Sequence, residues 1–427
     1  RRGVSVNERD ARVFSSAAAA LCAPCASANF LAAQMGNKLA TQAATPDANL
    51  ADVGAGALQL EQRLGDGRFL KTLKCLNADG ALVVKVFSKR DLNLSLAHYQ
   101  ELLHEVRVRL TINGAPNVAA FRWFRETPQA AFLVRQYFHA NLLERLTTPP
   151  FLTVVEKRWL AFQLLQALQQ CHELGVCHGD IKAENVMVTS WNWLFLTDLA
   201  NFKPAALPQD DPADFSYFFD SSARRSCYLA PERFLDGASS SRDDLARFEL
   251  LPSMDVFSAG CVLLELFVEG GPVFDLPALL RYRRGLPEEL DAYVAKLAAS
   301  LPADELPDAR RLLCDMTARD ARGRPKAAEC LQRGRACALF PEAFFTFAYG
   351  FFSSLRLLDH DRQAELLCDN YELLLRELGP PAGKAPRPSS VASDGAAEAA
   401  AAHAAGYLRR VEESWRDEKG GGAASAA

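Results

Sequence analysis

Four side chains within residues 176–200 have the types and the spacing needed for phosphoryl transfer from a nucleotide. Asp180 can accept the proton of a substrate hydroxyl, and Lys182 can neutralise the phosphoryl group that moves. Asn185 and Asp198 offer oxygen ligands that would hold Mg²⁺ against the nucleotide phosphates. The sequence therefore predicts a catalytic loop with Asp180 and Lys182 as catalytic residues and Asn185 and Asp198 as metal ligands.

The same stretch follows the order of a protein-kinase catalytic loop, with two departures. Most protein kinases carry an arginine before the catalytic aspartate, where this chain has Gly179, and Asp-Phe-Gly where it has Asp-Leu-Ala at 198–200. Without that arginine, a phosphate added to the following segment lacks its usual receptor, so ordering by phosphorylation is not expected. The apolar runs 185–188 and 193–197 predict a hairpin that carries both metal ligands.

Length and composition indicate a globular chain with room for about two domains and tails. The chain has 427 residues, 49% of them hydrophobic and 23% charged, and a formal net charge of −4 that gives no reason to expect nucleic-acid binding. One CxxC pair, Cys22 and Cys25, lies in an Ala/Ser-rich segment, so we expect reduced thiols rather than a zinc site. No apolar run reaches the roughly 18 residues of a membrane-spanning helix.

A glycine-containing turn and a lysine in an apolar strand precede the catalytic loop. Gly65 and Gly67 match the first two glycines of a kinase phosphate loop, whereas Leu70 replaces the third; a plain hairpin turn is the alternative. Lys85 lies inside the apolar run 81–87, and a buried lysine needs an anionic partner. In a kinase the partners are nucleotide phosphates and a glutamate on a helix, so we place Gly65, Gly67 and Lys85 at a nucleotide site.

The helix expected over residues 94–110 supplies the candidate glutamate. Glu101 and Glu105 lie one turn apart on the same face, so either could meet Lys85. We favour Glu105 and expect the other to be a solvated surface charge. The alternative is that both are surface charges.

A second apolar strand, over residues 131–137, turns polar where a kinase hinge begins. Backbone groups near Gln136 and Tyr137 are expected to bind a purine edge, which leaves ATP or GTP open as the nucleotide. The helix expected over 153–174 has its apolar residues on one face and delivers the chain to the catalytic loop.

Three residues are expected to hold the site together rather than to react. Asp255 opens the apolar helix 254–267 and would hold the catalytic-loop backbone, with a helix N-cap as the alternative role. Glu232, which ends the segment 198–232, is expected to form a structural ion pair with Arg324.

The predicted fold is α+β, a bilobal protein-kinase-like domain with a β-rich N-lobe and a helical C-lobe. Composition divides the chain into a disordered extension 1–34, an N-terminal segment 35–56, a kinase domain 57–340, a helical region 341–380 and a low-complexity linker or tail 381–427. A start at Met35 would expose Gly36 for N-myristoylation and make 35–56 a membrane-anchoring segment, although Ala40 stands where Ser or Thr is usual.

Three stretches closely resemble one atypical protein-kinase family. They are HGDIKAENVMVTSWNWLFLTDLANFKP from His178, DDPADFSYFFDSSARRSCYLAPERF from Asp210 and MDVFSAGCVLLELF from Met254. The chain is similar there, and at MGNKLA, to the protein-kinase-like regulatory subunit of the class III phosphatidylinositol 3-kinase complex, also called phosphoinositide 3-kinase regulatory subunit four. The resemblance covers about residues 35–380.

The resemblance implies a membrane-associated regulator and scaffold of a lipid kinase. Its partners would be the class III catalytic subunit and Beclin-like subunits, and its processes autophagy and endosomal or vacuolar sorting. The chain would be cytoplasmic and peripheral on endosomal, vacuolar or autophagosomal membranes, held there through a myristoyl group on Gly36. The resemblance also implies an α-helical HEAT-type region that starts near residue 355, and an N-terminal fragment of a longer protein.

Two functions from different classes fit these residues. One is a serine/threonine protein kinase that transfers the γ-phosphate of ATP to proteins with Mg²⁺, because every chemical residue is present. The other is a nucleotide-holding regulatory module with little or no phosphotransfer, a pseudokinase. We favour the second mechanism because Gly179, Leu70 and the pair 199–200 all depart from the kinase pattern.

Overall fold

The structure is a computed structural model of the chain. It describes residues 58–363 except for gaps at 79, 90–94, 113, 201, 210, 221–223, 237–246, 269–270, 302, 304–305, 337–338, 341 and 356–361. Met35, Gly36 and the segments predicted before residue 58 and after residue 380 lie outside the described residues. The chain divides into two units after Phe340, and each is described by itself.

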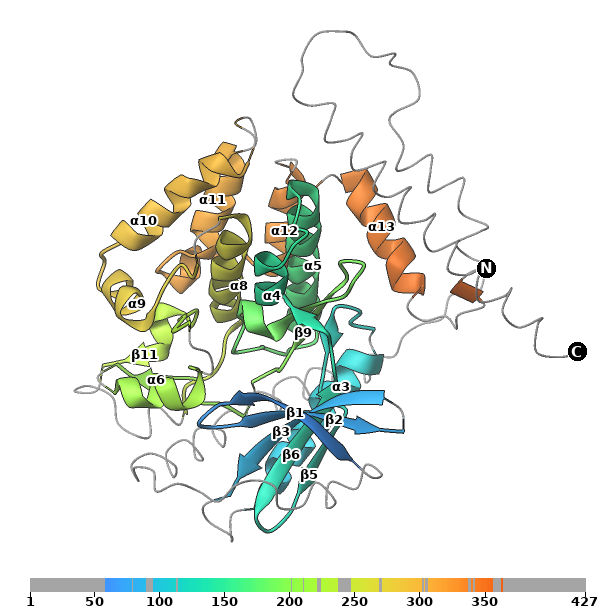
Figure 1. Ribbon diagram of the computed structural model, residues 1–427. Coiled ribbons are helices and arrows are strands. Elements are labelled where there is room, and N and C mark those ends of the chain that lie inside the picture. Colours follow the sequence, from blue (N-terminus) through green and yellow to red (C-terminus); the bar gives the residue numbers. More distant parts are fainter. Residues whose placement is uncertain are drawn as a thin grey trace, which may run out of the picture. The chain divides into compact units, whose positions relative to one another are not determined.

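A five-stranded antiparallel sheet forms the N-lobe (Figure 1). Its strands, in spatial order, are β1 (Gln59–Asp66), β2 (Lys71–Asn77), β3 (Gly80–Ser88), β6 (Ala130–Gln136) and β5 (Trp123–Glu126). Side chains alternate along a strand, so Val84 joins a cluster on one face of the sheet while Lys85 lies on the other. That second face also carries Phe87, which packs with residues of the helix α3 (Ala97–Ile112).

A small second sheet positions the catalytic loop. Its strands, in spatial order, are β4 (Val118–Ala119), β9 (Leu194–Thr197), β8 (Val186–Val188) and β7 (Ala140–Asn141). β8 and β9 form the predicted hairpin, with Val186 opposite Leu196. Asn185 ends a short 3-10 helix directly before β8, and Asp198 directly follows β9. The hairpin therefore brings both candidate metal ligands to the same end of the sheet.

Helices form the C-lobe around two central members, α5 (Val154–Glu173) and α8 (Pro252–Phe267), which pack against each other (Figure 1). Thr153 and Glu156 close a capping box at the start of α5, and the apolar face of α5 is buried as the sequence predicts. The other α-helices that the structure describes in this lobe are α4 (Leu142–Thr147), α6 (Pro212–Phe218), α9 (Leu276–Arg283), α10 (Glu288–Ala295), α11 (Leu306–Met316) and α12 (Ala327–Ala336). The bilobal α+β prediction is confirmed.

The segment 198–232, called the activation segment below, is fastened at both ends. Its early part forms β10 (Leu207–Pro208), which pairs in parallel with β11 (Phe234–Leu235) just beyond its end. At that end, Arg324 forms the expected pair with Glu232 through two hydrogen bonds of 2.7 and 2.8 Å. The Arg324 side chain is fully buried and also donates to three backbone carbonyls.

The second unit begins with α13 (Glu342–Leu355). This helix is apolar over most of its length, and Phe345 and Ala348 are buried. The structure describes too little of the region that follows to test the HEAT-type assignment, which stays a prediction.

The buried Arg324 yields a stability prediction. Glu232→Gln leaves the guanidinium charge buried and unpaired, so we expect a loss of about 3 kcal/mol in the free energy of unfolding. Chemical denaturation of the purified chain measures this loss. The exposed pair of Arg281 and Glu289 provides a matched control, because Glu289→Gln should change stability by less than about 1 kcal/mol. Equal effects of the two substitutions would contradict the structural role of the buried pair.

Candidate functional site: a cleft of paired charges

A buried carboxylate on α8 holds the backbone of the catalytic loop. Asp255 accepts hydrogen bonds from the amides of His178 (2.7 Å) and Gly179 (2.8 Å). Burial raises the pKa of Asp255, but the hydrogen bond and charge of His172 outweigh burial, so the pKa lies below its usual value. The residue at the N-cap of α8 is Leu251, so Asp255 anchors the loop rather than capping the helix.

Gly179 lies where the catalytic loop meets the activation segment. Its φ of +78° is in the left-handed region, and a Cβ there would come within 2.7 Å of Leu250. Its carbonyl accepts a 2.6 Å hydrogen bond from Arg233, whose guanidinium also donates to the carbonyls of Pro204 (2.9 Å) and Ala205 (2.7 Å). One buried arginine thus ties the activation segment to the catalytic loop. The sequence prediction missed Arg233, although it directly follows Ala-Pro-Glu.

Asp180, the predicted proton acceptor, is already bonded within the chain. Its Oδ2 lies 2.8 Å from the Nζ of Lys203 in the activation segment and 3.2 Å from the amide nitrogen of Asn185. The Nζ of Lys182 is 3.9 Å from the same oxygen and donates to the carbonyl of Phe219 at 3.1 Å. The structure brings together the predicted residues, but it adds Lys203, which the sequence prediction did not include, at the place where a substrate hydroxyl would have to bind.

The pKa values of Asp180 and Lys203 leave both groups ionised near neutral pH. Burial lowers the pKa of Lys203 to about 8, and the attraction of Asp180 offsets only part of that effect. Burial raises the pKa of Asp180, but the charges of Lys182 and Lys203 outweigh burial, and the pKa lies below its usual value. A carboxylate with a lowered pKa is a poor proton acceptor near neutral pH.

Asp198, the second predicted metal ligand, is paired with two cations. Its Oδ1 accepts a hydrogen bond of 2.8 Å from Nε of Arg135, and its Oδ2 accepts one of 3.1 Å from Nη2 of the same side chain. The Nζ of Lys85 lies 3.0 Å from Oδ2. Burial raises the pKa of Asp198, but Arg135 and Lys85 outweigh burial and hold it far below its usual value.

The expected pair between Lys85 and Glu105 is not formed. Glu105 instead pairs with Arg109 one turn further along α3, at 2.5 Å, and Lys85 takes its partner from the end of β9. The physical reason is that α3 turns the side chains of Tyr99 and Leu103 toward the sheet. Glu105 lies on a different face of the helix from those two residues.

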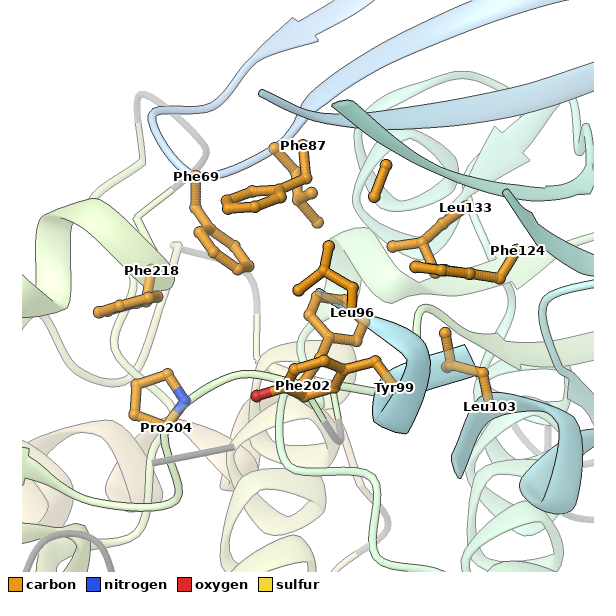
Figure 2. Close-up of a pocket in the computed structure, with 12 residues that line it drawn as sticks. Phe69, Phe87, Leu96, Tyr99, Leu103, Phe124, Leu133, Phe202, Pro204 and Phe218 are labelled. Atoms are coloured by element: carbon orange, nitrogen blue, oxygen red, sulfur yellow. The ribbon is translucent and has the colours of Figure 1, made fainter. Parts of the chain in front are cut away.

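An apolar pocket lies between the sheet, α3 and the activation segment (Figure 2). Residues from all three parts line it, among them Leu70, Phe87, Leu96, Tyr99, Leu103 and Leu133. Phe69, in the turn between β1 and β2, lies 6.1 Å from the ring of Phe202 and 5.1 Å from that of Phe218, centroid to centroid. The predicted phosphate loop is therefore packed onto the activation segment through aromatic rings.

The remaining predicted nucleotide contacts lie on strand ends of the N-lobe. Gly65 is in β1 and Gly67 directly follows that strand. Gln136 ends β6, and the amide of Tyr137 donates to the carbonyl of Ala81 at 3.3 Å. Their contact with a nucleotide stays a prediction.

The charges of the cleft suit phosphate better than they suit a metal ion. Two buried carboxylates, Asp180 and Asp198, lie among four cations. Arg135 and Lys182 are buried, and Lys85 and Lys203 are largely buried. The formal excess of two positive charges favours an anionic ligand. Arg135 and Lys85 already neutralise the Asp198 carboxylate and would repel a second cation there, so the residues present do not fit Mg²⁺.

The lowered pKa of Lys203 predicts a pH dependence of stability. Between about pH 8 and pH 10.5 the folded chain has lost this proton and the unfolded chain still binds it, so stability rises with pH in that window. We therefore expect the wild type to gain stability relative to Lys203→Met as the pH rises from 8 to 10. Denaturation of both proteins over this range measures the difference. A difference that does not change with pH would contradict the lowering of the Lys203 pKa by burial.

Comparison with known proteins places the fold and the cleft in a family. The model of the protein kinase domain matches residues 58–334. Serine/threonine-protein kinase VPS15 of Arabidopsis thaliana is 42% identical over 351 residues, which are 81% of this chain and 23% of that protein. The probable serine/threonine-protein kinase vps15 of Dictyostelium discoideum is 40% identical over 74% of this chain and 16% of its own length. Serine/threonine-protein kinase VPS15 of Saccharomyces cerevisiae is 39% identical over 69% of this chain and 20% of its own length.

The chain spans about a fifth of the length of these relatives. Within the described residues, no helix is both long and apolar enough to cross a membrane. The family model covers more than half of the chain, and the VPS15 kinases match it at 39–42% identity. The chain therefore belongs to the protein kinase family and, within it, to the VPS15 serine/threonine-protein kinases.

Proposed function

We propose that this chain is the regulatory, nucleotide-holding kinase module of a class III phosphatidylinositol 3-kinase complex, with little or no phosphotransfer. The observation that carries the proposal is the pairing of Asp180 with Lys203 inside the cleft. A hydroxyl substrate has to bind at that carboxylate, and the activation segment already fills the position with a buried amine.

Binding of a nucleotide is supported by the excess positive charge of the cleft. Phosphate groups would meet Lys85 and Arg135 from the sheet and Lys182 from the catalytic loop. Each of these cations is largely buried, where a charge acts more strongly than it does in water. The bound nucleotide, ATP or GTP, would then stabilise the domain by mass action.

The activation segment is held without a phosphate. Besides the contacts of Arg233, the buried Glu265 of α8 pairs with Arg224 and accepts a 2.7 Å hydrogen bond from the hydroxyl of Tyr228. Ser258 donates to the carbonyl of Tyr228 at 2.6 Å. A segment fixed by such buried contacts suits a scaffold surface better than a switch.

The partners and the location follow from the family alone. We propose that the chain assembles with the class III catalytic subunit and Beclin-like subunits, in autophagy and in endosomal or vacuolar sorting. A myristoyl group on Gly36, outside the described residues, would add a peripheral membrane contact.

A second candidate, an active serine/threonine protein kinase, is favoured by one observation. Asp180, Lys182, Asn185 and Asp198 gather in one cleft as phosphotransfer requires. Phosphotransfer would require the Lys203 side chain to move away from Asp180. The two candidate functions therefore differ in whether the ion pair between Lys203 and Asp180 persists.

Substitution of the acid separates the two candidates. Asp180→Asn keeps the shape of the side chain but removes the base, so it abolishes transfer in a kinase. For a scaffold we expect complex assembly and phosphatidylinositol 3-phosphate levels in cells to stay within about twofold of wild type, a difference of less than roughly 1 kcal/mol. Protein abundance is measured alongside as the control for folding. Loss of the lipid product at normal abundance would favour the active kinase.

Substitution of the strand lysine tests nucleotide binding. Lys85→Met removes one of the buried cations, and we expect it to weaken nucleotide binding at least about tenfold. In wild type, nucleotide at 100 times its Kd should add about 2.7 kcal/mol to stability. Calorimetric titration and thermal unfolding measure both effects. The partly exposed Lys157 on α5 supplies a control, Lys157→Met, which should bind as wild type does. Equal affinity of Lys85→Met would contradict the assignment.

A further inference from the structure

Arg135 occupies a position in the cleft that the sequence prediction did not assign. It is the last residue but one of β6, it is 5% exposed, and it reaches Asp198 from the sheet. Three nitrogens of the side chain are bonded: Nε and Nη2 to the Asp198 carboxylate, and Nη1 to the carbonyl of Gln136 at 3.0 Å. The planar fork of an arginine matches both oxygens of a carboxylate, which makes this a strong and directional contact.

The contact between Arg135 and Asp198 competes with binding of a metal ion at the Asp198 carboxylate. Mg²⁺ requires near-ideal octahedral geometry with oxygen ligands and tolerates few compromises. Both Asp198 oxygens accept from Arg135, and Oδ2 also contacts Lys85. A divalent cation at this carboxylate would stand beside two buried positive charges, and repulsion between like charges is strong where water is excluded.

Asn185, the other predicted metal ligand, is oriented by hydrogen bonds from its side-chain nitrogen. The side-chain nitrogen of Asn185 donates to the backbone carbonyl of Asp180 at 2.7 Å and to its carboxylate at 3.2 Å. A metal ion would bind the amide oxygen of Asn185, so these contacts orient the side chain, and the disagreement with the metal site that the kinase family implies lies at Asp198.

We propose that Arg135 takes the place of the metal ion, so that the cleft binds a nucleoside triphosphate without requiring Mg²⁺. This inference rests on the proposed function, since it names the form of the ligand at the same cleft. A metal-free triphosphate carries more negative charge than its magnesium complex. The fixed excess of positive charge formed by Lys85, Arg135, Lys182 and Lys203 against two carboxylates suits that more anionic form.

The test compares nucleotide affinity with and without the metal. Purified chain is titrated with the non-hydrolysable imido analogues of ATP and of GTP, in excess Mg²⁺ and in EDTA. We expect at least one of the two analogues to bind wild type, with a Kd in EDTA within about threefold of its Kd in Mg²⁺. Arg135→Met should bind at least about tenfold more weakly in EDTA and recover in Mg²⁺. Arg125→Met, an exposed arginine on the neighbouring strand β5, is the matched control and should behave as wild type.

A second measurement does not depend on nucleotide. Mn²⁺ alone is titrated into both proteins and followed by electron paramagnetic resonance. We expect Arg135→Met to bind a Mn²⁺ ion that wild type does not, because the substitution removes one of the two cations on Asp198 and both of its hydrogen bonds to that carboxylate. A tenfold or greater loss of wild-type nucleotide affinity in EDTA, or Mn²⁺ binding to wild type as tight as to the variant, would overturn the proposal. Failure of both analogues to bind in either condition would refute nucleotide binding, and with it this inference.

Discussion

Two buried cations on one carboxylate, Arg135 and Lys85 on Asp198, determine what the cleft can do. A charge taken out of water is tolerated only when it is paired, and removing one partner leaves the other at a cost of several kcal/mol. The pair joins β6 and β3 of the sheet to the end of β9. The lysine that a kinase pairs with a helix glutamate is thereby occupied, and Glu105 is left to pair along its own helix.

The need to pair buried charges also bears on how the activation segment is held, which in many kinases depends on phosphorylation. Kinases that depend on phosphorylation leave an arginine beside the catalytic aspartate to receive the phosphate. Here Gly179 has no side chain to receive a phosphate, and its backbone carbonyl accepts a hydrogen bond from Arg233. The donors of Arg233 reach backbone carbonyls and so hold the described part of the activation segment against the catalytic loop. The contact between Lys203 and Asp180 then follows from where that ordered segment passes.

Sequence reasoning predicted the parts that depend on local order along the chain. The hairpin that carries Asn185 and Asp198, the helices and the two-lobed α+β fold all follow from short apolar patterns and spacing. Contacts across the cleft were harder to predict from the sequence, because they join segments that are far apart along the chain. Arg135 and Asp198, for example, are 63 positions apart. Glu105 was misassigned because residue spacing shows which side chains share a helix face, but it does not show which face packs against the sheet. The positions of Lys203, soon after Asp198, and of Arg233, directly after Ala-Pro-Glu, could have been noticed in the sequence. Neither position shows which atoms the side chain contacts.

In our proposal, the cleft binds a nucleotide but neither hydrolyses it nor transfers its γ-phosphate. The most direct measurement is a single-turnover experiment in which the purified chain, in molar excess and with Mg²⁺ present, is loaded with triphosphate labelled in the γ-position. The position of the label is then followed over time in the bound nucleotide, in free phosphate and in protein. We expect the label to stay in intact triphosphate bound to the chain. Appearance of the label on protein, at a rate that falls with Asp180→Asn, would contradict it.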